Sequence, residues 1–160
     1  MAKRIVHYLN QFYAGIGGED MADVAPSSHA GSMGPGVAMQ AALGSEYEII
    51  GTVVAGDNYV NANLDTALAE VLERIRAYEP DGLIAGPAFN AGRYGVACGA
   101  ICKLVKEELK IPVITGMYQE NPGCDMYKKD MEIVVTKISA ADMRRCAPIM
   151  ARLLKKKLNG

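Results

Sequence analysis

Short apolar runs alternate along this chain with segments in which apolar residues recur at helical spacing. Five of the runs are typical of strands, namely residues 4–9, 48–55, 83–85, 111–115 and 133–135. One helical stripe predicts a helix that packs against a sheet and ends before Pro80: Leu64, Leu68, Val71, Leu72 and Ile75. Further helices are expected over residues 34–43, in a run that ends near residue 109, and over about residues 140–158.

Strands that alternate with helices of this length predict an α/β fold. We expect one domain over residues 1–160, with a doubly wound, mostly parallel sheet and helices on both faces, flavodoxin-like or Rossmann-like. The expected order of the five strands is about 2-1-3-4-5, and the last strand pairs either parallel or antiparallel at an edge.

Polar segments follow four of the predicted strands, at residues 10–33, 56–63, 86–99 and 116–125. The first is long, and loops of that length in a domain are usually functional or disordered. The segment at residues 86–99 is rich in glycine and joins a strand to a helix, a place where α/β proteins hold small ligands. Because the carboxyl ends of parallel strands meet at one edge of a sheet, the four segments are expected to converge there.

Side chains from these segments are candidate ligands for a small polar molecule. We predict substrate-binding roles for nine of them: Asn10, Asp57, Tyr59, Phe89, Asn90, Arg93, Tyr94, Tyr118 and Glu120. Arg93 is the only cation in these segments, so it either binds a carboxylate or pairs with Glu120 or Asp57. Asn58, Asn61 and Asn121 are also present, and a turn-forming role is the simpler interpretation for each of them.

Two histidines and four cysteines are the remaining candidates for chemistry. His7 alternates with apolar neighbours and is interpreted as a buried, hydrogen-bonded residue, whereas His29 in the long polar segment is the better candidate for proton transfer. The cysteines lack paired CxxC spacing, so we expect reduced thiols and no metal site: Cys98, Cys102, Cys124 and Cys146. Cys98 and Cys102 stand one helical turn apart. They are interpreted either as two ordinary buried thiols or as a redox pair.

Composition narrows the class of partner. The chain has 160 residues and half of them are apolar, so a sizeable core is expected. Its formal net charge of -1 argues against nucleic acid as its main binding partner. No apolar stretch approaches the roughly 20 residues that cross a bilayer, and no signal-peptide core is seen, which predicts a cytoplasmic protein without a membrane partner.

Several blocks of this sequence resemble one known family. They are residues 6–12 with the glycines at 15, 17 and 18, Gly34-Pro35-Gly36, the run Gly-Pro-Ala-Phe-Asn-Ala-Gly-Arg-Tyr-Gly-Val-Ala-Cys-Gly at residues 86–99, and residues 116–127. Together they resemble the N-terminal half of the component B gamma subunit, selenoprotein B, of the glycine, sarcosine and betaine reductase complexes of anaerobic amino-acid fermenters. The resemblance covers essentially the whole chain.

The resemblance implies reductive cleavage of a C–N bond. In the family a selenocysteine selenolate displaces the amine of the substrate, the carboxymethyl group passes to selenoprotein A, component C releases acetyl phosphate, and thioredoxin supplies electrons. The family's selenocysteine segment lies in its C-terminal half, and no cysteine of this chain matches it. We therefore expect no catalytic residue and no cofactor on this chain, no turnover by the chain alone, and a partner half or subunit that carries the selenocysteine.

Within this family, Arg93 is expected to receive the substrate carboxylate, and Tyr59, Phe89, Tyr94 or Tyr118 to face the ammonium group. An exposed apolar docking surface for the missing half is also expected. The alternatives are a non-catalytic module that binds a small anion and a structural half that only docks; a flavin protein ranks below both. The sequence does not choose among glycine, sarcosine and betaine, nor does it show whether Gly160 is the natural end.

Overall fold

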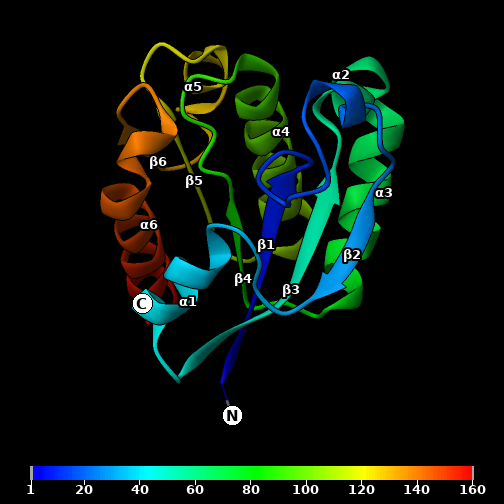
Figure 1. The fold of residues 1–160 in the computed structure, drawn as a ribbon. Helices are drawn as coiled ribbons and strands as arrows, with labels where there is room; N and C mark the ends of the chain where they lie inside the picture. The colour runs from blue at the N-terminus through cyan, green and yellow to red at the C-terminus, as the bar shows by residue number, and fades with distance from the viewer. Residues whose placement is uncertain (1, 160) are drawn as a thin grey trace.

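A six-stranded sheet forms the centre of the protein, in the order β2-β3-β1-β4-β5-β6 (Figure 1). The computed structural model describes residues 2–159. Five strands are parallel: β1 (Lys3–Asn10), β3 (Tyr47–Ala55), β4 (Gly82–Ala85), β5 (Val113–Tyr118) and β6 (Ile133–Thr136). They are the five predicted strands in the predicted order, so the doubly wound α/β fold is confirmed, and the last strand is parallel.

Helices cover both faces of the sheet because its strands carry apolar side chains on both sides. Helices α3 (Leu64–Ala77) and α4 (Gly92–Leu109) pack on the face that holds Val6 and Tyr8. Helices α1 (Gly36–Leu43) and α6 (Met143–Leu158), the latter preceded by the short helix η2 (Ala140–Asp142), pack on the face that holds Ile5. In the predicted stripe on α3, Val71, Leu72 and Ile75 are buried, Leu68 is half-buried, and Leu64 at the start of the helix is 38% exposed.

Three segments predicted as loops contain regular structure. Residues 10–33 include the short helix η1 (Glu19–Met21) and the strand β2 (Ser27–Ala30), which pairs antiparallel with β3. Residues 56–63 include α2 (Asp57–Ala62), and residues 116–125 hold the end of β5 and most of α5 (Pro122–Tyr127). These elements are short, and the backbone partners of β2 lie on the distant strand β3, so no apolar periodicity marks them.

The buried histidine and thiols lie in the core. His7 is fully buried on β1, with its Nε2 atom 2.8 Å from the Gly86 carbonyl oxygen, and burial lowers its pKa to about 4. This confirms the interpretation of His7 as a buried, hydrogen-bonded residue. All four cysteines are free and buried. Burial raises the pKa of Cys98 and of Cys102, so neither is poised to react as a thiolate.

The glycine-rich segment permits close packing of α4 against the loop before α5. A methyl group added at Gly95 would meet the side chain of Asn121. That side chain donates to the carbonyl oxygens of Phe89 at 2.9 Å and Ala91 at 3.0 Å, and its Oδ1 accepts the Gly123 N–H at 2.9 Å. Asn121 therefore joins the segment to the start of α5, and Gly95 leaves room for it.

Gly95→Ala is expected to lower the free energy of unfolding by about 1–3 kcal/mol, because the added methyl group overpacks this contact and displaces the buried amide. Urea denaturation followed by circular dichroism measures the change. Gly18→Ala is the control, since an added methyl group there meets only Asp20 Oδ1 at 3.7 Å. Equal stability of the two variants would contradict this account of Gly95.

Candidate functional site

A hollow of about 330 Å³ lies where β1 ends and helices α2 and α4 begin. We call it the rim hollow, and its lining residues are Asn10, Gln11, Phe12, Tyr13, Gly18, Glu19, Asp57, Ala91 and Arg93. They come from the segments that follow β1, β3 and β4. The convergence of these segments at the carboxyl edge of the sheet is the arrangement that the parallel topology predicts.

Asp57 is the buried acid of the rim hollow, with a residue exposure of 6%. Asn10 Nδ2 donates to its Oδ2 at 2.9 Å, and the Asp57 backbone N–H donates to Gln11 Oε1 at 3.1 Å. Asp57 Oδ1 is buried and has no hydrogen-bond partner among the described residues. Burial raises the pKa of Asp57 to about 6, while the Asn10 hydrogen bond and the charge of Arg93 oppose the shift. One oxygen of this carboxylate is therefore buried without a hydrogen-bond partner, which is consistent with the raised pKa.

Arg93 is the cation of the rim hollow, and among the lining residues it is the only one with a positive charge. Its Nη2 atom lies 2.6 Å from both oxygens of Glu19, so its ion partner is Glu19 and not Glu120 or Asp57. The Arg93 side chain is 43% exposed and that of Glu19 is 73% exposed. An ion pair this exposed is worth at most about 1 kcal/mol, so another carboxylate can replace Glu19 on the guanidinium.

Helix α4 places Arg93 beside an uncapped helix start. Its N-cap residue is Ala91, whose side chain accepts no hydrogen bond, and both Ala91 and Arg93 line the rim hollow. Asn61 Nδ2 donates to the carbonyl oxygens of Asp57 at 2.9 Å and Arg93 at 3.0 Å. Asn61 thus ties the backbone of α2 to that of α4, which supports the structural interpretation of this asparagine.

An aromatic cluster forms one wall of the rim hollow. The Tyr13 ring stacks on that of Tyr94 with centroids 5.9 Å apart, and it meets Phe12 edge-on at 5.1 Å. The centroid of the Phe89 ring lies 6.2 Å from that of Tyr13. Tyr94 and Phe89 are buried, whereas Phe12 is 61% exposed. Of this cluster, Phe12 and Tyr13 are the rings that line the hollow.

The structure brings together three of the nine predicted site residues, Asn10, Asp57 and Arg93. The other six do not line the rim hollow: the Tyr59 hydroxyl donates to Glu70 Oε1 at 2.7 Å, Phe89 and Tyr94 are buried, Tyr118 is half-buried, and Asn90 and Glu120 are exposed. A substrate-binding role for the nine stays a prediction. Phe12, Tyr13, Gly18 and Glu19 were not predicted, although Phe12 and Tyr13 follow β1 directly and could have been found from that position.

The second histidine lies away from this hollow. His29 was expected in a loop, but it belongs to β2, and its Nε2 atom lies 2.9 Å from Ser27 Oγ. This location does not support a role in proton transfer at the rim hollow, because His29 is absent from the lining residues.

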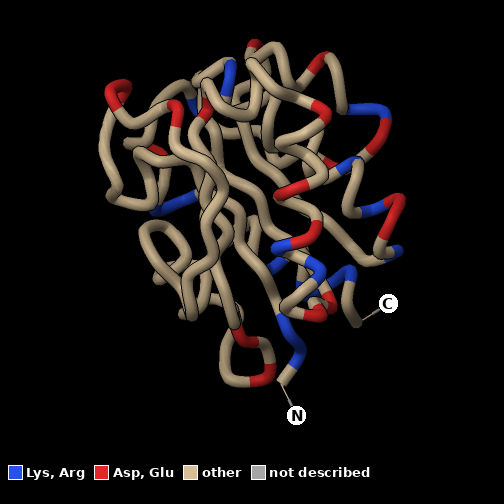
Figure 2. The backbone as a smooth tube through the Cα atoms, turned by 90° about the vertical axis from the view of Figure 1, so that its right-hand side faces the viewer, with Lys and Arg blue, Asp and Glu red and all other residues tan. Residues whose placement is uncertain are grey.

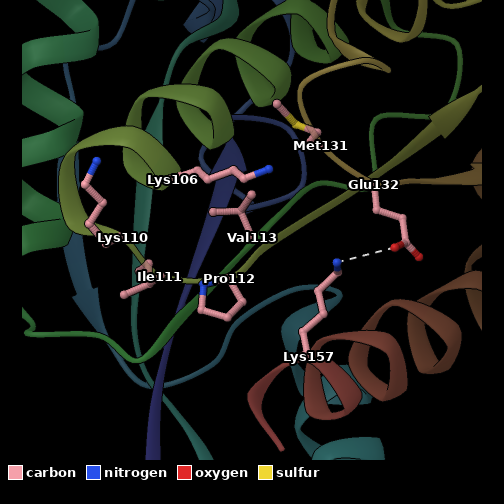
Figure 3. A pocket seen from close by; sticks show the side chains of 8 residues that line it. All are labelled: Lys106, Lys110, Ile111, Pro112, Val113, Met131, Glu132 and Lys157. Carbon is pink, nitrogen blue, oxygen red and sulfur yellow. Dashed lines mark ion pairs between the residues drawn. The ribbon is translucent and has the colours of Figure 1, made fainter. Parts of the chain in front are cut away.

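A second, larger hollow of about 460 Å³ lies below the C-terminal half of α4 (Figure 3). Its floor is apolar, with Ile111, Pro112 and Val113 at the start of β5. Two lysines at its border are already engaged: Lys106 donates to the Asp130 carbonyl oxygen at 2.8 Å, and Lys157 pairs with Glu132 at 3.3 Å. It lies at the amino end of β5, the opposite end from the one where α/β sheets bind ligands, so the rim hollow is the better candidate.

Charge, metal ligation and membrane-spanning helices are further features that bear on function. Acidic and basic positions are interspersed along the backbone in the view of Figure 2. Among residues 2–159, no cluster of three or more His, Cys, Asp or Glu side chains is arranged to hold a metal ion. None of the described helices combines the length and apolar character needed to cross a membrane.

Comparisons with known proteins identify relatives of this chain. The family model described as glycine/sarcosine/betaine reductase selenoprotein B matches residues 2–160. The sarcosine reductase complex component B subunit beta of Peptoclostridium acidaminophilum is 54% identical over 157 residues, which are 98% of this chain and 36% of that protein. The glycine reductase complex component B subunit gamma of Symbiobacterium thermophilum is 54% identical over 153 residues, 96% of this chain and 36% of that protein.

A betaine-type relative is more distant. The betaine reductase complex component B subunit beta of Peptoclostridium acidaminophilum is 41% identical over 158 residues, 99% of this chain and 36% of that protein. The chain thus spans about 36% of the length of these relatives. No solved structure matches it.

Proposed function

The chain belongs to the glycine/sarcosine/betaine reductase selenoprotein B family, and from this premise we propose that it forms the substrate-binding part of component B in such a complex. The observation that carries the proposal is the presence of both Asp57 and Arg93 among the residues that line one small hollow. An amino-acid substrate is a zwitterion. A carboxylate and a guanidinium group in one hollow therefore match its positive and its negative end, respectively.

Each end of the substrate has a partner of suitable chemistry. The substrate carboxylate takes the place of Glu19 on the Arg93 guanidinium, next to the uncapped N-terminus of α4. The substrate ammonium group faces the negative charge of the Asp57 carboxylate, since Asp57 lines the same hollow. The α-carbon between the two ends is then held in one orientation, which lowers the entropic cost of attack by an external nucleophile.

The nucleophile is expected on the part of component B that this chain does not match. None of the four cysteines lines the rim hollow. Burial raises the pKa of Cys98, and it raises the pKa of Cys146 to about 11, so these thiols are protonated at neutral pH. In the displacement, a selenolate forms a bond to the α-carbon while the C–N bond breaks and its electron pair leaves with the amine. This chain contributes the substrate orientation.

A docking role is the second candidate, and it has its own observation. The edge strand β6 and the residues after it expose apolar side chains: Val135 is 53% exposed and Ile138 is 57% exposed. An unpaired strand edge with exposed apolar residues is a site at which another polypeptide can pack. The two roles are compatible, because a substrate-binding part must also meet the part that carries the nucleophile.

Calorimetry and reconstitution test the proposal together. We expect glycine or sarcosine to bind the chain, or the component B assembled from it and the remaining part. We also expect the assembled component, with selenoprotein A and component C, to release the amine. If assembly restores amine release but Arg93→Ala and Asp57→Asn leave the kinetics unchanged, the chain is a docking module. If neither the chain nor the assembled component binds an amino acid, substrate binding is excluded.

A further inference from the structure

The part of the chain that forms β6 and α6 carries an excess of positive charge. Residues 128–160 contain nine Lys or Arg and three Asp or Glu, whereas residues 1–127 contain eight and fifteen. The basic segment thus has a net charge of +6 and the rest of the chain a net charge of -7. This segment includes β6, η2 and α6, on the side of the sheet opposite to β2 and α3 (Figure 1); Figure 2 views the side of β2 and α3.

An open sheet edge belongs to this basic segment. β6 is the last strand in the sheet order, and among the described strands it pairs only with β5. The Val135 carbonyl oxygen points away from β5, because it accepts from Arg145 Nη2 at 3.4 Å. The N–H and C=O groups of one strand residue point to the same side, so the Val135 N–H is also directed outward. The edge can therefore both donate to and accept from an added strand.

Apolar side chains accompany this edge. Val135 is 53% exposed and Ile138, which follows β6, is 57% exposed. Four residues of α6, each four positions after the one before, form a row along the helix: Arg145, Ile149, Leu153 and Lys157. Both ends of the row contact the β6 segment, since Arg145 donates to the Val135 carbonyl and Lys157 Nζ lies 3.3 Å from Glu132 Oε1. The row therefore runs beside the edge, and we call Val135, Ile138 and this row the β6 face.

Charge complementarity indicates what covers the β6 face. Resting on the docking role proposed above, we infer that the β6 face receives an acidic, extended segment of the remaining part of component B, which adds a strand to β6. The relatives contain such a further part, because this chain spans about 36% of their length. Apolar side chains of the segment contact Val135 and Ile149, and its carboxylates pair with exposed cations of α6 such as Arg152 and Lys156.

A second copy of the chain fits the β6 face less well. A symmetric dimer brings the same face of two copies together, so the two basic segments would repel each other. A head-to-tail contact with the acidic side of another copy does not close and gives open filaments. Nucleic acid has no use for a strand edge with exposed apolar side chains, and the charge of -7 on the rest of the chain opposes its approach.

Reversal of two exposed cations on α6 tests the charge. Arg152→Glu combined with Lys156→Glu is expected to weaken association of the chain with the remaining part of component B by about 10- to 100-fold in about 50 mM salt. In about 500 mM salt the loss should shrink to less than about threefold, because salt screens exposed charges. Surface plasmon resonance measures both values. Both side chains are exposed, so the core is left intact.

Arg74→Glu combined with Arg76→Glu is the matched control. It changes the net charge by the same amount on α3, which lies on the other side of the sheet from β6, and association should stay within about threefold of the wild-type value. Equal weakening by both pairs of substitutions would show a general effect of net charge and would overturn the inference.

Hydrogen exchange tests the added strand. The Val135 amide is expected to exchange at least about tenfold more slowly in the assembled component, because the added strand accepts from it. If the two parts assemble with unchanged exchange at Val135 and without dependence on Arg152 and Lys156, the inference fails and the docking role survives. If they do not associate, both fail, and calorimetric binding of an amino acid by the chain would still support substrate binding.

Two other occupants would also overturn the inference. Self-association of the chain alone, measured by light scattering and abolished by Val135→Asp, would assign the β6 face to a second copy. Binding of duplex DNA that is lost in the Arg152→Glu, Lys156→Glu variant would assign it to nucleic acid. Neither is expected for the chain at micromolar concentration.

Discussion

Arg93→Ala is expected to weaken the binding of glycine by about 10- to 100-fold, because a hydrogen-bonded ion pair between the guanidinium and the substrate carboxylate contributes about 1.5–3 kcal/mol. Among the residues that line the rim hollow, no second cation can take over this role. Calorimetry on the chain and the Michaelis constant of the assembled component B measure the effect. The loss is expected for all substrates alike, since they share the carboxylate.

Glu19→Gln distinguishes a binding arginine from one that only pairs with its neighbour. Glu19 occupies the Arg93 guanidinium in the ligand-free protein, so its carboxylate competes with that of the substrate. Removing this charge is expected to strengthen binding about two- to fivefold, since an exposed ion pair is worth at most about 1 kcal/mol. Arg74→Ala is the control, because Arg74 lies on α3, donates to Ser28 Oγ at 3.0 Å and does not line the hollow. Unchanged affinity in Arg93→Ala would exclude the carboxylate assignment.

Asp57→Asn is expected to raise the free energy of unfolding at pH 7 by about 1–3 kcal/mol while it weakens substrate binding. The pKa of Asp57 is raised from 3.8 to about 6 in the folded protein, chiefly by burial. The folded state therefore favours the protonated acid. The stability linked to Asp57 is fully present below pH 4 and is lost as the pH rises through 6. An amide has no charge to bury, so the variant avoids this loss at neutral pH.

The surroundings of Asp57 account for the direction of this shift. The groups with an electrostatic effect on it are Asn10 on β1, Arg93 on α4 and Glu19 on η1; Asn10 and Arg93 lower its pKa, and Glu19 raises it. The buried Tyr8 and Tyr94 hydroxyls add no hydrogen bond to it, since both lack partners among the described residues. The effect of burial on the Asp57 pKa is therefore larger than the opposing effects of the Asn10 amide and the Arg93 cation, which both favour the charged carboxylate.

Asp142→Asn is the matched control for the pH dependence, with the opposite sign. Asp142 Oδ2 accepts from Arg145 at 2.7 Å and from the Lys137 N–H at 2.9 Å, and the Arg145 hydrogen bond is the main cause that lowers the Asp142 pKa to about 2. Its contribution to stability is present above pH 4 and is lost as the pH falls toward 2. Asn at this position should destabilise the protein at pH 7. Urea denaturation at pH 4, 5.5 and 7 compares the variants, and a destabilised Asp57→Asn at pH 7 would show that Asp57 is a structural acid.

The sequence alone determined the elements whose pattern is local. Each parallel strand is an apolar run and α3 has an apolar stripe, so the five strands and their order were predictable from periodicity and the right-handed crossover. The same topology predicted that the polar segments after β1, β3 and β4 would converge. Asn10, Asp57 and Arg93 were found in this way, because a strand end places its next residues at the edge.

Only the tertiary structure decided which side chains face one another there. Arg93 pairs with Glu19, 74 residues away, because η1 folds back over the start of α4, and nothing in the local pattern of residues 10–33 marks that helix. Tyr59 turns to Glu70, and Tyr94 is buried on the face of α4 that packs against the sheet. Side-chain direction depends on the packing of neighbouring elements, whereas periodicity records only the burial of each element by itself. The sequence therefore predicted that Asp57 and Arg93 belong to the rim hollow, but it did not predict which side chains they contact there.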